Sequence, residues 1–249
     1  MSFKKMKQLS VFSGGCDGFS LAGKWLGWET IGLVENDPSR IKRLKKNFPK
    51  APIFEDIKIN NEYGEFDIIS GGDPCQPHSN SGNRKGKSDP RYLWPEKFAI
   101  IRKYNPRYVV NENVFGTVSN GVLDQKINDL ESVGYTCWPP IVIPASYVGA
   151  WHTRKRVWLV AYSPEERRKI ILCRNSSSRF KANKPPITLD TQSNPFLQFE
   201  KSMGQPPIFG MDDGIPDRVD RLGMIGDSIV PQIAYKLFSV IDFINKSNL

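Results

Sequence analysis

The sequence predicts an α/β fold in which a parallel sheet is flanked by helices. Strand-like and helix-like patterns alternate over the first 160 residues, which is typical of such a sheet. A glycine-rich loop directly follows the first strand-like run, and acidic residues directly follow later runs. A chain of 249 residues can form one large domain, or one domain with a small appendage.

Short apolar runs predict the strands, and longer segments with helical periodicity predict the helices. Pro38 fits the first turn of one helix, and Gly134 fits the position just after the end of another. The expected strands cover residues 8–12, 30–34, 52–54, 66–69, 108–110 and 157–161. The expected helices cover residues 38–47, 93–104, 122–133 and 229–244.

The segment 164–220 differs from the rest of the chain, because it is rich in Pro, Ser, Asn and Gly and has weak periodicity. Within it, residues 165–184 hold seven Lys/Arg against two Glu, a local balance of +5. Such a stretch is either a solvated loop or a surface that binds phosphates. We therefore expect a domain at 1–163, a small irregular region at 164–220, and a return to the domain at 221–249.

The composition favours a polyanionic partner, because 35 Lys+Arg against 26 Asp+Glu give a net charge of +9 at pH 7. The four cysteines, at positions 16, 75, 137 and 173, have no metal-ligand spacing, and there are only two histidines. We expect no metal site and no disulfide framework, which fits a reducing compartment. No apolar run approaches the roughly 20 residues that span a bilayer, and no signal peptide is visible, so no membrane association is expected.

Cys75 is the first candidate for chemistry. The segment 72–76, which reads GDPCQ, follows the apolar run 66–69. Cys75 is therefore expected on a loop at the carboxyl edge of the sheet, where open α/β sheets bind their ligands. A thiolate there is a suitable nucleophile, although a lone cysteine is more often a small buried hydrophobe.

Glu112 strengthens that interpretation. It follows a second buried-strand run, 108–110, so its carboxyl group is expected near the Cys75 thiol at neighbouring strand ends. Such a pair suits attack on an electron-poor ring, because the thiolate adds to carbon while the carboxyl group hydrogen-bonds or protonates a ring nitrogen. Without Cys75, a solvated loop acid would be the better interpretation of Glu112.

Gly14, Gly18 and Glu35 occupy the places that hold a nucleotide-like ligand in many α/β folds. The glycines let the backbone approach the ligand, and an acid after the second strand accepts hydrogen bonds from ribose hydroxyls. This pattern would also fit a dehydrogenase. However, the loop lacks an intact G-x-G-x-x-G, and hydride transfer has no need for a Pro-Cys nucleophile, so NAD is not expected.

Taken in order, these motifs resemble those of the DNA cytosine-5 methyltransferases, which use S-adenosyl-L-methionine on a Rossmann-like sheet. The matching segments are 12–19, Glu35, Asp56-Ile57, Pro74-Cys75-Gln76 with Ser79, 93–96, Glu112-Asn113-Val114, 152–156 and 226–230. None of them is specific alone, whereas the ordered set is. It runs through nearly the whole chain.

The resemblance implies a role for each matching residue. It assigns catalysis to Cys75, Glu112, Arg154 and Arg156. It assigns cofactor binding to Phe12, Ser13, Gly14, Gly18, Phe19, Glu35, Asn36, Asp56, Ile57, Asp73, Pro74, Leu93, Asp227, Ser228 and Ile229. It assigns DNA contacts to Gln76 and Ser79, and to Arg84, Lys85 and Lys87 of a basic loop, and it implies no metal.

The implied reaction transfers the methyl group of S-adenosylmethionine to C5 of cytosine in double-stranded DNA. Cys75 would add to C6, and Glu112 would bind the N3 edge, which requires that it hold or share a proton. Burial is therefore expected to raise the pKa of Glu112. Arg154 and Arg156 would hold the cytosine carbonyl, Glu112 or a phosphate. Attack at C6 above the ring requires that the base be flipped out of the duplex.

The chain departs from the family pattern at several positions. The glycine loop is one residue longer than usual, and Asp17 stands where a glycine is expected, which predicts looser cofactor binding. Asp227 replaces the asparagine of the last motif, and His152 replaces a glutamine. The target-recognition region, 164–220, is short, which resembles compact phage or prophage members.

Two alternatives stay open. An RNA cytosine-5 methyltransferase would apply the same chemistry to another polymer, and the short recognition region slightly favours it. A catalytically silent DNA- or cofactor-binding protein would account for Asp17 and Asp227, but the intact Cys75, Glu112 and Arg156 argue against it. On the main interpretation we expect a monomer that binds double-stranded DNA in the cytoplasm of a bacterial or phage-infected cell.

Overall fold

A sheet of eight strands forms the centre of the computed structural model, which describes residues 4–59, 61–74, 92–119, 121–150, 153–175 and 228–247. The strands are β1 (Lys7–Val11), β2 (Glu29–Val34), β3 (Ile53–Phe54), β4 (Ile68–Gly71), β5 (Tyr108–Val114), β6 (Thr136–Cys137), β7 (Ile141–Pro144) and β8 (Lys155–Tyr162). Their order is β3-β2-β1-β4-β5-β8-β6, with β7 paired to β8 off this path. The strands β1 to β5 are parallel to their neighbours in this set.

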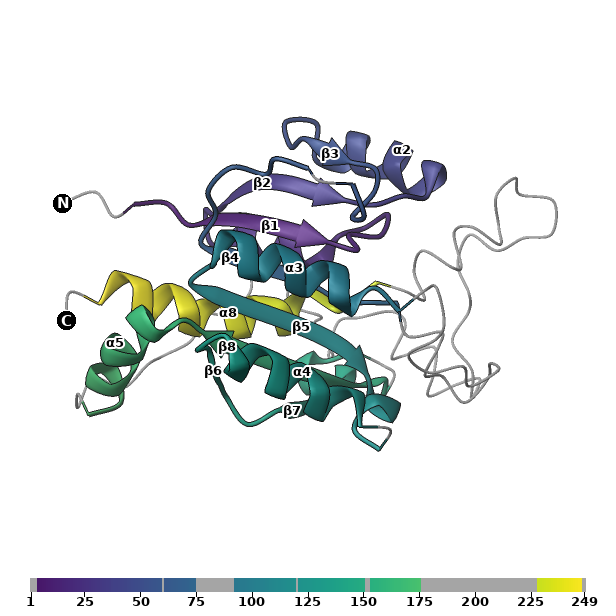
Figure 1. The fold of residues 1–249 in the computed structure, drawn as a ribbon. Coiled ribbons are helices and arrows are strands. Elements are labelled where there is room, and N and C mark those ends of the chain that lie inside the picture. The colour runs from purple at the N-terminus through teal and green to yellow at the C-terminus, as the bar shows by residue number, and fades with distance from the viewer. Residues whose placement is uncertain are drawn as a thin grey trace.

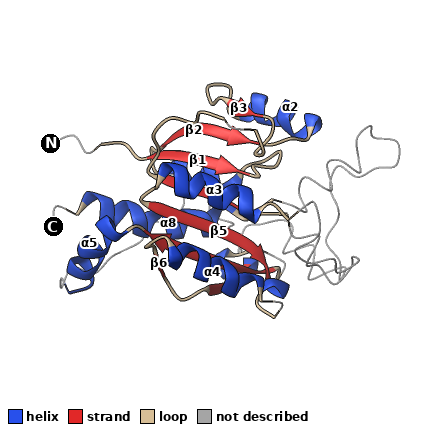
Figure 2. Ribbon diagram, in the orientation of Figure 1, coloured by secondary structure: helices blue, strands red, loops and turns tan. Residues whose placement is uncertain are grey.

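Helices cover both faces of the sheet (Figures 1 and 2). One face carries α1 (Gly18–Trp25) and α8 (Pro231–Lys246), and the other carries α3 (Trp94–Tyr104) and α4 (Val122–Ser132). The helix α2 (Pro38–Asn47) lies near the β3 edge, and α5 (Pro164–Asn175) follows β8. The arrangement therefore has three layers.

The alternation of side chains along each strand explains the two helical layers. In β5, Val109 joins the core beneath α3 and α4, whereas Tyr108 and Val110 join the core beneath α1 and α8. Successive side chains of a strand point to opposite faces, so a strand covered on both faces is apolar throughout. This is why the sequence predicts the central strands as continuous apolar runs.

Every strand and helix predicted from the sequence has a counterpart here, but three findings differ from prediction. Strand β5 continues to Val114, so Glu112 lies within it rather than after it, because β8 pairs with β5 along that whole length. The elements α1, β6 and β7 were not predicted. The first part of the region expected to be irregular forms the helix α5.

Strand β8 also contradicts the expectation of an all-parallel sheet, because it runs antiparallel to β5, β6 and β7. Residues 145–154 connect β7 to β8, which is fewer than the dozen or more residues that a crossover between parallel strands requires. Antiparallel pairing puts Arg156 opposite Val114. Arg156 thereby becomes a diagonal neighbour of Glu112 on the same face.

Glu166 fastens α5 to the sheet. Its carboxylate accepts hydrogen bonds from Arg107 Nε at 2.8 Å and from the Tyr108 hydroxyl at 2.9 Å. Burial alone would raise the pKa of Glu166, but the hydrogen bonds and charge of Arg107 outweigh it and hold the pKa below its usual range. A carboxylate with a lowered pKa stabilises the fold above its unfolded pKa, and this stabilisation is lost as the pH falls through the folded value.

We expect Glu166→Gln to lower the free energy of unfolding by about 1–3 kcal/mol at pH 7, because a buried charged hydrogen-bond partner is lost. Urea unfolding measures this, and the difference from wild type should shrink as the pH falls below about 4. The control is Glu165→Gln, an exposed neighbour in the same helical turn, with an expected change within about 0.5 kcal/mol. Equal losses in both variants would contradict this role of Glu166.

Candidate active site

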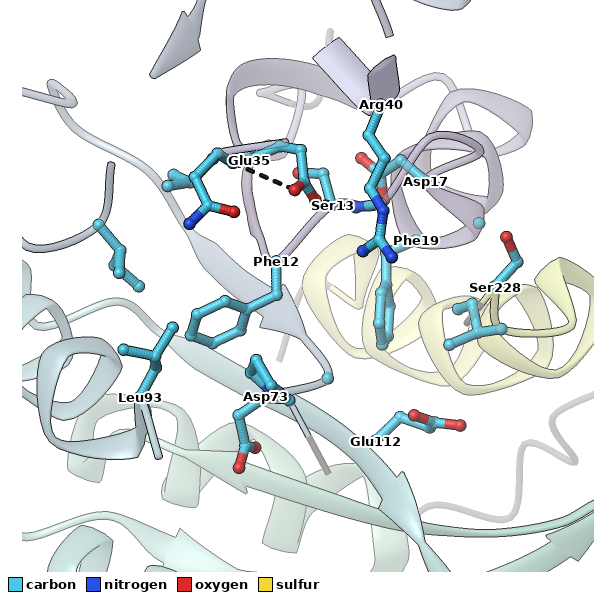
Figure 3. Close-up of a pocket in the computed structure, with 18 of the residues that line it drawn as sticks. Phe12, Ser13, Asp17, Phe19, Glu35, Arg40, Asp73, Leu93, Glu112 and Ser228 are labelled. Atoms are coloured by element: carbon cyan, nitrogen blue, oxygen red, sulfur yellow. Dashed lines mark hydrogen bonds between the residues drawn. The ribbon is translucent and has the colours of Figure 1, made fainter. Parts of the chain in front are cut away.

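A cavity of about 450 Å³ lies at the carboxyl ends of the parallel strands, where α/β sheets of this kind bind ligands (Figure 3). It collects every described residue that the sequence assigned to catalysis or to the cofactor. These residues are Phe12, Ser13, Gly14, Gly18, Phe19, Glu35, Asn36, Asp56, Ile57, Asp73, Pro74, Leu93, Glu112, Arg154, Arg156, Ser228 and Ile229. Residues far apart in the chain thus share one cavity.

The remaining assigned residues lie outside the described ranges, so their positions stay predictions. They are Cys75, Gln76, Ser79, Arg84, Lys85, Lys87 and Asp227. Conversely, the cavity includes residues that sequence reasoning had not assigned to it. They are Asp17, Val34, Arg40, Glu55, Lys58, Gly72, Asn113 and Val114.

Arg40 illustrates how such a residue could have been found. It lies in the first turn of α2, which begins at Pro38 after the N-cap residue Asp37. A helix that starts directly after the second strand places its first turn beside the strand ends, and Figure 3 shows the Arg40 side chain at the cavity. The start of this helix in the sequence would therefore have been enough to predict a cationic side chain at the cavity.

The loop after β1 has an unusual backbone at Phe12, whose φ is 57°. A non-glycine residue in this region costs about 1–2 kcal/mol, and such strain is concentrated at ligand sites. The backbone N–H of Ser13 donates to the carbonyl of Val34 at 3.0 Å, which fastens the loop to β2. The turn directs the chain out of the strand, and Phe12 lines the cavity.

Asp17 serves as the N-cap of α1. Its Oδ1 accepts hydrogen bonds from Ser20 N at 3.2 Å and from Ser10 Oγ at 3.0 Å. Burial raises the pKa of Asp17 to about 6, against the opposing effect of these hydrogen bonds. The carboxyl group that replaces a glycine therefore stabilises the start of the helix. Its effect on cofactor affinity stays a prediction.

Glu35 joins the glycine loop to the end of β2. Its carboxylate accepts backbone hydrogen bonds from Gly14 at 2.8 Å, Asn36 at 3.1 Å and Asp37 at 3.0 Å. A carboxylate has about four acceptor positions, so one remains for a ligand hydroxyl. The apolar side chains of Ile57 and Leu93 line the same cavity. This combination fits the ribose and adenine of S-adenosylmethionine.

The C-terminal segment lies directly against the glycine loop. A Cβ atom at Gly18 would come within 2.7 Å of Ile229 Cγ1, so only glycine fits the start of α1 at this contact. Helix α8 is held to the same region by Trp28, whose indole N–H donates to Asp242 at 2.9 Å and whose ring stacks on Phe238. The two ends of the chain therefore build one wall of the cavity together.

Glu112 is 7% exposed and lines the cavity. Burial raises the pKa of Glu112 to about 7, although the charges of Arg156 and Arg154 offset part of the rise. Arg156 Nε lies 3.0 Å from Glu112 Oε1. The raised pKa is the one expected from burial, so this carboxyl group can hold a proton near neutral pH.

Among the described residues, no group of three or more His, Cys, Asp or Glu side chains could hold a metal ion. None of the described helices has the length and hydropathy that crossing a bilayer requires.

An α/β sheet with Glu35 and Glu112 in one cavity at its carboxyl edge is typical of enzymes that bind a nucleoside cofactor. Residues 6–205 match the family model of the C-5 cytosine-specific DNA methylases. The chain therefore belongs to this family, which uses S-adenosylmethionine as methyl donor.

Curated relatives agree with this assignment. The chain is 30% identical to the Type II methyltransferase M.NgoMIV of Neisseria gonorrhoeae over 162 alignment positions, and the match covers 61% of this chain and 50% of that protein. It is 29% identical to M.HindV of Haemophilus influenzae over 226 alignment positions, and the match covers 85% of this chain and 71% of that protein. The chain spans about half the length of several of these relatives, with 47% for M.FnuDI of Fusobacterium nucleatum.

Solved structures show the same fold. A candidate DNA modification methyltransferase from an E. coli prophage aligns with a TM-score of 0.55 at 24% identity, covering 66% of this chain and 48% of that chain. DNMT2 of Spodoptera frugiperda aligns with a TM-score of 0.54 at 22% identity, covering 74% and 56% respectively. The Rossmann-like α/β fold class is thereby confirmed.

Proposed function

We propose that the protein transfers the methyl group of S-adenosylmethionine to C5 of cytosine in double-stranded DNA, with Cys75 as the nucleophile. The observation that carries this proposal is Glu112, a buried carboxyl group with a raised pKa beside Arg156. It shares its cavity with Glu35 and the glycine loop, which suit the cofactor. Family membership supports the same chemistry.

Each protein group has a defined task in this reaction. Cytosine C5 is a poor nucleophile until the Cys75 thiolate forms a bond to C6, which makes the ring enamine-like. The carboxyl proton of Glu112 hydrogen-bonds N3 and stabilises the charge that develops on the ring. The cofactor would supply an electrophilic methyl group, whose bond to the sulfonium sulfur breaks as C5 forms its bond to that carbon, leaving S-adenosylhomocysteine. A base then removes the C5 proton, the C–H electron pair re-forms the C5–C6 double bond, and the bond between C6 and Cys75 breaks to restore the thiolate.

Arg156 and Arg154 keep the Glu112 region electropositive. Their charges favour the ionised form of Glu112 and so limit how far burial raises its pKa. The same charges suit the cytosine carbonyl or a nearby phosphate. This is why both arginines belong to the proposed catalytic group.

DNA is the proposed partner, and the protein acts on it as a monomer in the cytoplasm of a bacterial or phage-infected cell. The net charge of +9 favours binding to a polyanion. Gln76, Ser79, Arg84, Lys85 and Lys87 would contact the DNA after the base is flipped out, at a cost of a few kcal/mol. The region 164–220 would recognise the target sequence within a domain at 1–163 that 221–249 completes.

The direct test incubates the protein with methyl-labelled S-adenosylmethionine and either mixed-sequence duplex DNA or RNA, followed by nucleoside analysis. We expect label in 5-methyldeoxycytidine. Label only in 5-methylcytidine from RNA would replace the proposal with the RNA enzyme. No label in either polymer, with intact cofactor binding, would instead indicate a silent binding protein.

Cofactor binding should depend on Glu35. We expect Glu35→Gln to raise the dissociation constant of S-adenosylmethionine about tenfold, because the amide loses charged hydrogen bonds with the three backbone donors and with the ribose. Calorimetry measures this. The control is Glu29→Gln, an exposed acid at the opposite end of the same strand, where no change is expected. An unchanged affinity in Glu35→Gln would refute this assignment.

A further inference from the structure

Four buried polar side chains form a cluster behind the cavity, between the sheet and helices α3 and α4. Lys97 extends from α3 and donates to Asn111 in β5, whereas Lys126 extends from α4 and pairs with Asp73, just after β4. All four are nearly inaccessible to solvent, with exposed fractions of 0% for Lys97 and 1% for Lys126. We call these four residues the lysine cluster.

The hydrogen bonds of the lysine cluster connect the end of β4 to the end of β5. Lys126 Nζ lies 2.5 Å from Asp73 Oδ1, which also accepts from Asn111 Nδ2 at 3.1 Å. Lys97 Nζ donates to the Gly71 carbonyl at 2.9 Å and to Asn111 Oδ1 at 2.8 Å. Asn111 and Lys97 thereby connect the segment 71–74 to β5, and Lys126 connects it to α4.

Stability alone does not account for such a cluster. Two buried lysines face one buried carboxylate, and an apolar group of similar size at these positions is often as stable as a buried ion pair. Burial lowers the pKa of Lys97 to about 7, which shows how strongly its charge is disfavoured there, even with Asp73 nearby. Because burying these charges lowers stability, we look for their role in the function of the neighbouring cavity.

We propose that Lys97 and Lys126 are positioning residues of the methyl-transfer reaction, which hold the segment 71–74 in register with Glu112. The chain continues from this segment into Cys75, so its placement sets where the nucleophile's loop begins. Asn113 adds to the connection, because its side-chain amide donates to the Asp73 carbonyl at 3.4 Å. The inference rests on the proposed function for its effect on rate.

The lysine cluster also acts on Glu112 through charge. The charged groups that face Glu112 are Arg156 and Arg154 near β8, Asp73 after β4, and Lys126 on α4. Asp73 raises the pKa of Glu112, whereas Lys126 lowers it. Removing the charge of Asp73 should therefore shift the pH at which the reaction rate changes. Loss of a purely structural contact would leave that pH unchanged.

Two variants separate these effects. Lys97→Met removes the hydrogen bonds to the Gly71 carbonyl and to Asn111 but keeps an unbranched chain in the buried position. Asp73→Asn keeps the shape and an acceptor for Lys126 but removes the negative charge. The control is Lys103→Met on the same helix, α3, because Lys103 is exposed and pairs with Glu62 away from the cavity.

Hydrogen exchange of the amides of residues 71–73 is measured together with kcat and the dissociation constant of S-adenosylmethionine. For Lys97→Met we expect exchange at least about tenfold faster and kcat about 10²-fold lower, since small misplacements cost that much. Cofactor affinity should fall by a smaller factor, because only Asp73 and Pro74 of the cofactor residues lie in this segment. For Asp73→Asn we expect the fall in activity above pH 7 to begin at lower pH. Lys103→Met should match wild type.

Exchange in Lys97→Met equal to that in Lys103→Met, or an unchanged kcat, would overturn the proposal. The proposal would also be overturned if the fall in kcat of Lys97→Met were fully explained by the fraction of that variant that is unfolded. If the wild-type protein methylates no DNA, the proposed function fails. The exchange measurement still decides whether the lysine cluster holds the segment.

Discussion

Replacing Cys75 by alanine is expected to lower the rate of methyl transfer to DNA by more than about 10⁴-fold. Without a thiolate at C6, cytosine C5 stays a poor nucleophile, and covalent catalysis is lost altogether. The affinity for S-adenosylmethionine should stay within about threefold, because Glu35 and the glycine loop are unchanged. Single-turnover methylation together with calorimetry measures both quantities.

Cys137→Ala is the matched control for this experiment. Cys137 lies in β6 and is not among the residues that line the cavity, so its replacement should leave the rate within about twofold. A Cys75→Ala protein that methylates DNA at the wild-type rate would remove the nucleophile from the mechanism. Equal losses in both variants would indicate damage to the fold instead.

Replacing Glu112 by glutamine should lower the rate by about 10²–10³-fold, because the amide cannot transfer a proton to N3. The proposed mechanism uses the protonated carboxyl group of the wild-type protein. Since burial raises the pKa of Glu112 to about 7, the ratio of the wild-type rate to the Glu112→Gln rate should fall as the pH rises through that value, because ionisation of Cys75 affects both proteins alike. The pH profiles of kcat for the two proteins measure this ratio.

The same variant should be more stable than the wild type at pH 8. The folded state keeps the Glu112 proton up to about pH 7, whereas the unfolded chain releases it near pH 4.5. Stability is therefore lost as the pH rises between these values, by up to about 3 kcal/mol in total. Glutamine avoids this loss, so urea unfolding should show a gain at pH 8 that disappears below about pH 4.5.

A Glu112→Gln protein that is less stable than the wild type at pH 8 would contradict the raised pKa. The combination of lower activity and higher stability is typical of residues whose strain serves function. Here the strain is electrostatic, because the carboxyl group is buried at 7% exposure and its pKa stays raised although Arg156 lies at ion-pair distance.

The position of the site could be predicted from the sequence because it depends on strand ends. Carboxyl ends of parallel strands meet at one edge of a sheet, so Glu35 after β2 and Glu112 near the end of β5 had to lie on the same side. The glycine loop after β1 follows the same rule. This is why all the described candidates line one cavity.

The direction of β8 could not be predicted in the same way. Its apolar run is as typical of a parallel strand as of an antiparallel one, and the choice depends on the short connection from β7. The contact between Arg156 and Glu112 follows from that choice. The helix α5 was missed for a related reason, because its attachment to the sheet depends on Glu166 and the distant Arg107.

The lysine cluster was equally hidden. Lysines in helices are mostly exposed, and nothing near Lys97 or Lys126 in the sequence indicates a buried partner. Their partner Asp73 is more than twenty residues away from the nearer of the two. Only the folded arrangement brings a carboxylate and two lysines together beneath the cavity.

The measurement that tests the central claim most directly is the trapping of the covalent intermediate. Duplex DNA with 5-fluorocytosine in place of cytosine is incubated with the protein and S-adenosylmethionine. Fluorine at C5 cannot leave as a proton does, so the bond between C6 and the thiol persists after methyl transfer. We predict a protein–DNA adduct that contains the methyl group and maps to Cys75 by peptide mass spectrometry. Methylation of ordinary duplex DNA by the same preparation without any such adduct, or an adduct at another residue, would contradict the account.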